Sequence, residues 1–276
     1  MKRTYIYFAA AFIGLAAVTS CTKIIDIELN SAAQKIVIEA KISDNNRPAR
    51  VILTRTTDFF NPDTLERVTD ATVIITSNLG ETDTLKEMSD GIYRGSTIKG
   101  KSGTRYFIKI TDGTQTYEAD SFLPEKVNID SVGFLKKETK SPHSTPGYLV
   151  NCTFTDPGDQ HNYYRINASV ISQDTTRHQT LSKTTVIDDP LFNGRQNTVS
   201  INRMQSFQPG DTVLIELISI DQDVFRYFHQ LYGSIGMPAR FSSSAPANPD
   251  TNLSNGAMGY FSAQAVDSRI MVLPEW

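Results

Sequence analysis

The histidines and the carboxylates beside them are the first residues whose chemistry has to be weighed. His161 follows Asp156-Pro157-Gly158-Asp159-Gln160, so an imidazole and two carboxylates could converge there on a hard metal ion. The other histidines, His143, His178 and His229, have no second histidine or cysteine at short spacing. Asp-Pro-Gly-Asp is also a sequence that a tight turn favours without any ligand. We therefore expect a turn, with no metal and no cofactor.

Two carboxylate pairs are candidates for acid and base catalysis. Asp221 and Asp223 flank the expected start of a helix, where carboxylates stabilise the free backbone N–H groups. Asp188 and Asp189 precede Pro190 in an expected loop, and neighbouring side chains of an extended chain point apart. The sequence also lacks the local signatures of serine hydrolases, zinc proteases and nucleotide-binding proteins. We expect a protein that is not an enzyme and has no catalytic residues.

Cys21 is the residue with the clearest chemistry. Lys2 and Arg3 precede an uncharged, apolar run from Ile6 to Val18, which is typical of an export signal. As a helix this run would rise only about 20 Å, less than the roughly 30 Å of a bilayer core. Val18-Thr19-Ser20-Cys21 then resembles the bacterial lipobox, in which the cysteine thiol accepts a diacylglyceryl group. We expect a signal peptide over residues 1–20 and lipidation at Cys21; the alternative is a conventional secretory signal with an incidental cysteine.

The composition limits the classes of partner and fold. The chain has 27 Lys and Arg against 30 Asp and Glu, a net charge of -3, so no basic field points to nucleic acid. An acidic protein is not attracted to anionic lipids, which leaves the acyl chains to hold it on the membrane. Two cysteines cannot build a disulfide scaffold. Once Cys21 is acylated, Cys152 has no partner, and its place in an alternating segment predicts a small buried hydrophobic residue.

Short alternating segments fill residues 35–123, after a tether at residues 21–34. Two Asp-Gly steps and one Ser-Gly step separate several of these segments, as in consecutive hairpins. The expected strands cover residues 36–42, 51–57, 71–77, 82–88, 106–111 and 115–122. About seven strands at this spacing predict an immunoglobulin-like β-sandwich over residues 35–123.

Residues 124–276 contain longer β segments and one helical pattern. The expected strands cover residues 147–155, 163–172, 198–203, 211–220, 259–266 and 269–273. Between them, apolar side chains from Val224 to Ile235 recur at helical spacing, which predicts an amphipathic helix over residues 222–235. The predicted fold is therefore mainly β, with two tandem β domains of which the second carries this helix.

Two segments are candidate contact surfaces. Residues 236–258 contain three prolines and a serine run, which predicts a long loop that either contacts a partner or is a disordered connection. Phe59 and Phe60 lie on an expected loop tip, where they either anchor a partner or fold back as a lid. Together with Phe241 on the long loop, they are the candidate partner-binding residues.

Several stretches in sequence order resemble an uncharacterised family of Bacteroidetes lipoproteins, that of domain of unknown function 4249. The matching stretches are Lys35 to Ala40, Val51 to Thr54, Asp70 to Val73, Gly91 to Tyr93, Phe154 to Pro157, Asn162 to Arg165, Arg226-Tyr227 and Asn255 to Phe261. In the last stretch Ala257-Met258 stand where the family commonly has another glycine. The resemblance implies an outer-membrane lipoprotein, often encoded beside a TonB-dependent receptor, with no established activity.

Taken together, we expect a lipid-anchored lipoprotein of the outer membrane, on its periplasmic face or at the cell surface. Its expected role is to bind a glycan or peptide ligand or to assist a TonB-dependent receptor in nutrient uptake. Two alternatives stay open. One is a lipid-anchored hydrolase with a site between the two domains, and the other is a cell-surface adhesion or structural protein.

Overall fold

A computed structural model describes residues 34–57, 66–137, 146–171, 183–201, 207–236 and 248–275. The chain divides into two units, Met1–Ala33 and Gln34–Trp276, and the described residues belong to the second. Cys21, Phe59, Phe60 and Phe241 lie outside the described residues. The described part is mainly β, as the alternating sequence pattern predicts.

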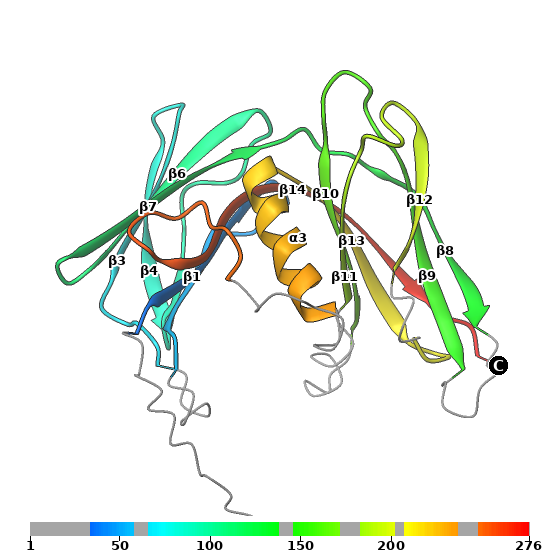
Figure 1. Cartoon of the computed structure of the whole chain (residues 1–276), viewed down its shortest axis with the longest axis horizontal. Helices are drawn as coiled ribbons and strands as arrows, with labels where there is room; N and C mark the ends of the chain where they lie inside the picture. Colours follow the sequence, from blue (N-terminus) through cyan, green and yellow to red (C-terminus); the bar gives the residue numbers. More distant parts are fainter. Residues whose placement is uncertain are drawn as a thin grey trace, which may run out of the picture. The chain divides into compact units, whose positions relative to one another are not determined.

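The structure describes the following elements (Figure 1): β1 (Ile36–Ser43), β2 (Arg50–Arg55), β3 (Thr72–Ser77), β4 (Thr82–Ser89), β5 (Ile92–Arg94), β6 (Thr104–Asp112), β7 (Gln115–Leu123), β8 (Ile129–Lys137), β9 (Gly147–Thr155), β10 (Tyr163–Val170), β11 (Lys183–Asp188), β12 (Gln196–Ile201), β13 (Thr212–Ile220), α3 (Gln222–Gly236) and β14 (Met258–Val272). The predicted strands are present, each within two residues of its expected ends, except at the chain's C-terminal strand. There the prediction of two strands is wrong, because β14 continues through Asp267 and Ser268.

The first half of the described chain is a β-sandwich around its own apolar core. Its strands follow the order β1-β2-β5-β4-β3-β6-β7 within the larger sheet, and β14, from later in the chain, pairs with β1. Alternate side chains of β1, β3 and β6 point into the core, among them Ile38, Ile75 and Ile108. Strand β7, at one end of this order, also contacts β14: the Ala263 N–H of β14 donates to Ser121 Oγ of β7 at 2.8 Å.

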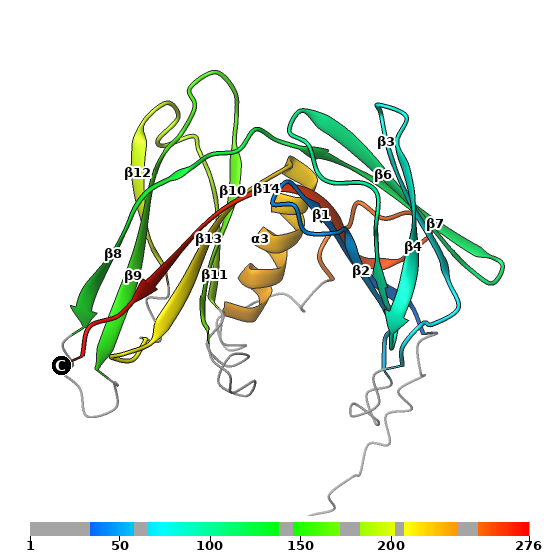
Figure 2. The ribbon, with the colours of Figure 1, turned by 180° about the vertical axis from the view of Figure 1, so that it is seen from behind.

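The second half has three layers. A smaller sheet with the order β12-β9-β8 packs against β10 and β13, and the core between the two sheets includes Phe154, Tyr164 and Leu217. Helix α3 covers the opposite face of β10, β13 and β14, where Val224 and Phe228 contact a separate apolar cluster. Figures 1 and 2 show the helix from both sides of this arrangement.

Strand β14 joins the two halves. Its first part pairs in parallel with β1, from Val37 opposite Met258 to Ser43 opposite Gln264. Its second part pairs antiparallel with β13, from Ser219 opposite Ala265 to Thr212 opposite Val272. Among the described residues, the pairing therefore continues through one 11-stranded sheet that contains strands from before and after Pro124.

The amphipathic helix predicted over residues 222–235 is confirmed as α3. Asp221 caps it, because its Oδ1 accepts the Val224 N–H at 2.9 Å. The other carboxylate oxygen accepts the Ser121 hydroxyl and the Phe122 N–H, so the cap also fixes the helix to β7. Burial raises the pKa of Asp221, and these hydrogen bonds oppose that shift. Within the described residues, no helix has the length and apolar character needed to cross a membrane.

Candidate functional site

A cavity of about 430 Å³ lies on the face of the large sheet that also carries α3. Residues of β1, β2 and β5 line it from one side, and residues of β10, β13 and β14 line it from the other. Its charged lining residues are Lys41, Arg47, Arg50, Arg94, Arg165 and Glu216. Five basic side chains thus face one carboxylate in a space large enough for a small molecule.

Three of the basic residues form a row across neighbouring strands. Lys41 of β1 lies directly opposite Arg50 of β2, and Arg50 lies directly opposite Arg94 of β5. Like charges in directly opposite positions destabilise a sheet. None of the three forms an ion pair with another residue in the described part of the chain, and the Arg50 Nε is buried without a hydrogen-bond partner there.

Arg165 contributes a buried charge from the other side of the cavity. Gln264, Phe228 and Tyr260 hold its side chain in place. Nη2 donates to Gln264 Oε1 at 3.1 Å, the guanidinium carbon lies 4.4 Å from the centre of the Phe228 ring, and the side chain is hydrogen-bonded to Tyr260. Gln264 is itself fixed, because its Nε2 donates to Ser43 Oγ at 3.2 Å. Arg165 is only 7% exposed, and its Nε has no hydrogen-bond partner among the described residues.

The lining of the cavity carries more positive than negative charge, with five basic side chains and one carboxylate. Desolvation, followed by the nearby charges of Arg165 and Arg50, lowers the pKa of Lys41, although its side chain remains accessible to solvent. Glu216 is the carboxylate that opposes this shift. Such a cavity is suited to holding an anion through charge and hydrogen bonds.

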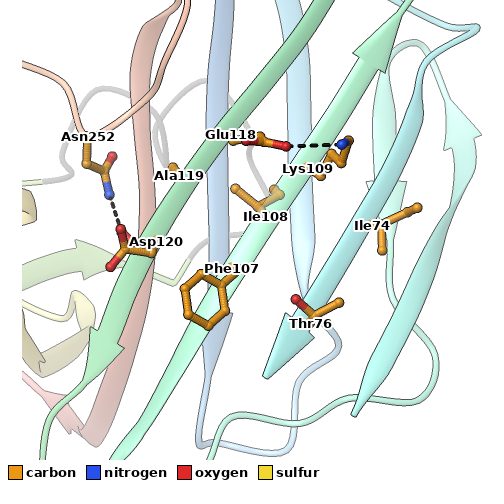
Figure 3. Close-up of a pocket in the computed structure, with 9 residues that line it drawn as sticks. All are labelled: Ile74, Thr76, Phe107, Ile108, Lys109, Glu118, Ala119, Asp120 and Asn252. Carbon is orange, nitrogen blue, oxygen red and sulfur yellow. Dashed lines mark hydrogen bonds and ion pairs between the residues drawn. The ribbon is translucent and has the colours of Figure 1, made fainter. Parts of the chain in front are cut away.

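A second, open groove of about 510 Å³ lies on the outer face of β3, β6 and β7 (Figure 3). Its floor includes Phe107, which is 42% exposed. Its charges already have partners, since Lys109 Nζ lies 3.1 Å from Glu118 Oε1 and the Asp120 carboxylate is paired with Arg105. The basic residues of the cavity are not neutralised in this way, so the cavity is the stronger candidate site.

The family of the chain follows from its match to a known family model. Residues 22–270 match the model described as domain of unknown function (DUF4249). The chain belongs to the DUF4249 family. No curated protein matches it.

Two of the stretches that carry the family resemblance, Phe154 to Pro157 and Asn162 to Arg165, contact each other in the fold. Asp156 is buried and accepts hydrogen bonds from the Tyr164 hydroxyl and from the Gly194 N–H at 3.0 Å. Burial and the Asp156 carboxylate raise the pKa of Tyr164. The next residue, Arg165, points to the opposite face of β10 and lines the cavity. One strand thus supplies both a structural contact and a site residue.

The structure brings together two groups that the sequence treats separately. His161 Nε2 lies 3.1 Å from Asp189 Oδ1 and 3.8 Å from Asp188 Oδ2. Asp188 is the last residue of β11, so its assignment to a loop is wrong. Asp189 is buried, and its Oδ2 accepts the Asn162 N–H at 2.8 Å. In the described ranges, no three His, Cys, Asp or Glu side chains are grouped as metal ligands.

Cys152 is buried in the core between the two sheets of the second half, as predicted, and it is not in a disulfide. Burial raises the pKa of its thiol to about 12. The thiolate that a nucleophilic cysteine needs is therefore scarce at neutral pH.

The sequence alone does not predict the charged residues that line the cavity. Arg165 gives no special local signal, because it shares the polar face of an alternating strand with Asn167 and Ser169. Lys41 and Arg50 occupy polar positions of alternating or β-branched strands, which a solvated face would explain equally well. Only the pairing of β1, β2 and β5 brings their charges into one row.

Proposed function

We propose that this DUF4249 protein is a lipid-anchored binding lipoprotein of the outer membrane that works beside a TonB-dependent receptor in nutrient uptake. The observation that supports a binding role is the cavity with five basic side chains and one carboxylate. The export signal and the lipobox at Cys21 support the anchor. The protein would act on the periplasmic face of that membrane or at the cell surface.

Binding accounts for the cavity better than acid and base chemistry does. Its described lining contains no histidine, cysteine or aspartate, and its carboxylate, Glu216, shares the cavity with five basic side chains. Ser43, the hydroxyl residue of the lining, accepts a hydrogen bond from Gln264 and is not hydrogen-bonded to a lysine, histidine or carboxylate among the described residues. The chemistry that remains is electrostatic attraction of an anion.

Isolation of the tagged lipoprotein from outer membranes in mild detergent tests the receptor partnership. Mass spectrometry of the co-purifying proteins should show a TonB-dependent barrel in stoichiometric amount, and an untagged strain serves as the control. If the lipoprotein is isolated alone, the accessory role is wrong. Product release from polymer substrates by that isolated protein would favour a hydrolase, and retention on whole cells without turnover would favour adhesion.

The anchor makes a prediction at a single residue. Cys21→Ala should abolish incorporation of labelled palmitate and release the protein from the membrane fraction, because the acylated thiol is lost. Radiolabel and fractionation of cells measure both effects. Cys152→Ala is the matched control, since it removes the chain's other cysteine from a buried site and should leave labelling unchanged. Label in the Cys21→Ala protein would disprove the anchor.

A further inference from the structure

We propose that the cationic cavity binds a compact, hydroxylated small molecule with two or more negative groups, such as a polycarboxylate or a phosphorylated compound. This inference rests on the proposed binding function and names its ligand class. Three features of the described residues support it: charges without counter-charges, buried donors without acceptors, and a lining that leaves little room for an apolar ligand.

The row of Lys41, Arg50 and Arg94 has no counter-charge within ion-pair distance among the described residues. Directly opposite cations on three neighbouring strands repel one another, and the described residues supply no ion pair to any of them. Glu216, from β13, is the carboxylate that shares the cavity with this row. A bound anion would remove the repulsion, so the row is better explained as a binding surface than as a stabilising part of the sheet.

Two buried donors point to the same chemistry. The Nε atoms of Arg50 and Arg165 are both buried and have no acceptor among the described residues. A guanidinium presents Nε and Nη as a planar fork that matches the two oxygens of a carboxylate or phosphate. Phe228 and Gln264 already fix the orientation of Arg165, so little side-chain entropy is lost when an anion binds.

The positions of the charges indicate more than one anionic group. Arg165 extends from β10, whereas Lys41 and Arg50 extend from β1 and β2, on the other side of β13 and β14. A ligand with two separated oxyanions can contact both sides at once. Between them, Glu216 lies opposite Asn167 and offers acceptors for a ligand hydroxyl.

The remaining lining excludes a large apolar ligand. Its apolar members are Pro48, Ile218 and Val266, and no aromatic residue is among the lining side chains of the described chain. The volume of about 430 Å³ lies in the range of small-molecule sites. A polycarboxylate or a phosphorylated sugar fits these limits, and a flat aromatic ligand finds nothing on which to stack.

Isothermal titration of the full-length lipoprotein in detergent with citrate, pyrophosphate and glucose tests the ligand class. We expect citrate, pyrophosphate or both to bind, with affinity that falls as salt is added, and glucose not to bind. Binding of citrate alone would assign a polycarboxylate, and binding of pyrophosphate alone would assign a phosphorylated ligand. Absence of binding by both anions at low salt would overturn the proposal.

Variants separate the cavity from the rest of the surface. Arg50→Ala and Arg165→Ala should each weaken binding at least tenfold, and Arg50→Lys should keep part of the affinity because it keeps the charge without the fork. Arg105→Ala is the control, since Arg105 is paired with Asp120 on the outer face of β6. Thermal unfolding of every variant reports whether it is folded. An equal loss of binding in Arg105→Ala would overturn the assignment to the cavity.

The ligand class and the receptor partnership can fail independently. Anion binding without a co-purifying barrel would retain the ligand class and reject the accessory role. A stoichiometric barrel with a lipoprotein that binds neither anion would retain the accessory role and reject the ligand class.

Discussion

Gly259→Ala is expected to prevent stable folding. Gly259 has a φ of +96°, and a Cβ at this position would lie 2.0 Å from the Ile38 carbonyl oxygen of β1. Because Gly259 is directly opposite Ile38 in the parallel pair, the added methyl group would push β14 away from β1. We expect a loss of about 4 kcal/mol or more in the free energy of unfolding, at the upper end of single-residue effects. Urea unfolding and the yield of soluble protein measure it.

Gly256→Ala provides the matched control for this substitution. Gly256 also has a positive φ, +68°, but a Cβ there would meet nothing within 4 Å. The expected cost is therefore only the left-handed backbone strain, about 1–2 kcal/mol. Equal stability of the two variants would show that the close approach of β14 to β1 is not what Gly259 permits.

Asp83→Ala is the second substitution with a large expected effect. Asp83 is 3% exposed, and its Oδ2 accepts the backbone N–H groups of Ser96, Thr97 and Ile98 at 2.8, 2.7 and 3.0 Å. Alanine would leave these donors without their acceptor, at about 1–3 kcal/mol for each donor that stays buried. We expect the free energy of unfolding to fall by about 4 kcal/mol. The three donors directly follow β5, so the variant should also displace Arg94 of the cavity.

The effect of Asp83→Ala should depend on pH. Desolvation acts to raise the pKa of Asp83, but the three N–H groups outweigh it and hold the pKa below the ordinary 3.8. A lowered folded-state pKa means that the carboxylate stabilises the fold above 3.8 and that this contribution disappears as the pH falls through the lowered value. Urea unfolding in neutral and in strongly acidic buffer should therefore show a larger difference in stability between wild type and variant in the neutral buffer than in the acidic one.

Two further substitutions test whether the loss of stability in Asp83→Ala comes from the loss of the acceptor for the three backbone N–H groups. Asp83→Asn keeps an acceptor oxygen without the charge and should lose less stability than Asp83→Ala. Asp130→Ala removes a carboxylate that is exposed and accepts bonds only from the side chains of Thr155 and Gln196 among the described residues. Its stability should stay close to that of wild type. A loss in Asp130→Ala as large as that in Asp83→Ala would contradict the role of the three backbone donors.

Local patterns in the sequence were sufficient to predict most of the strands and the helix. In β1, Ile36, Ile38, Ala40 and Ile42 are buried because alternate side chains of a strand share one face. The stripe from Val224 to Phe228 likewise predicted α3, and Asp221 caps it as its residue type suggests. Each of these signals lies within one segment, so no knowledge of distant pairing was needed.

Strands with weak local patterns were missed or divided. β5 has only three residues, and β8 alternates poorly because it is an edge strand in which Phe134 and Leu135 are both exposed. The sequence predicts two strands in place of β14 because Asp267 and Ser268 are residue types that favour turns. In the fold, Asp267 Oδ2 accepts the Ile129 N–H at 2.8 Å, which holds the polar residue within a continuing strand.

The cavity could not be predicted for a different physical reason. Its residues come from six strands and from the connection between β1 and β2. The row of Lys41, Arg50 and Arg94 exists only because two strand pairs have a particular register. A shift of one residue in either pair would turn one of these side chains to the opposite face. That register is set by packing across the whole sandwich, which no local segment encodes.

The position of β14 also determines when the protein can fold. Gln264 of β14 bonds to Ser43 of β1 across 221 positions of the chain. A growing polypeptide therefore contains β1 long before it contains the strand that covers the open edge of β1. Until then an apolar strand with unpaired backbone groups invites pairing with other chains. The open edge of β1 is covered only when β14 pairs with it, and the entropy of closing so long a loop makes that step slow.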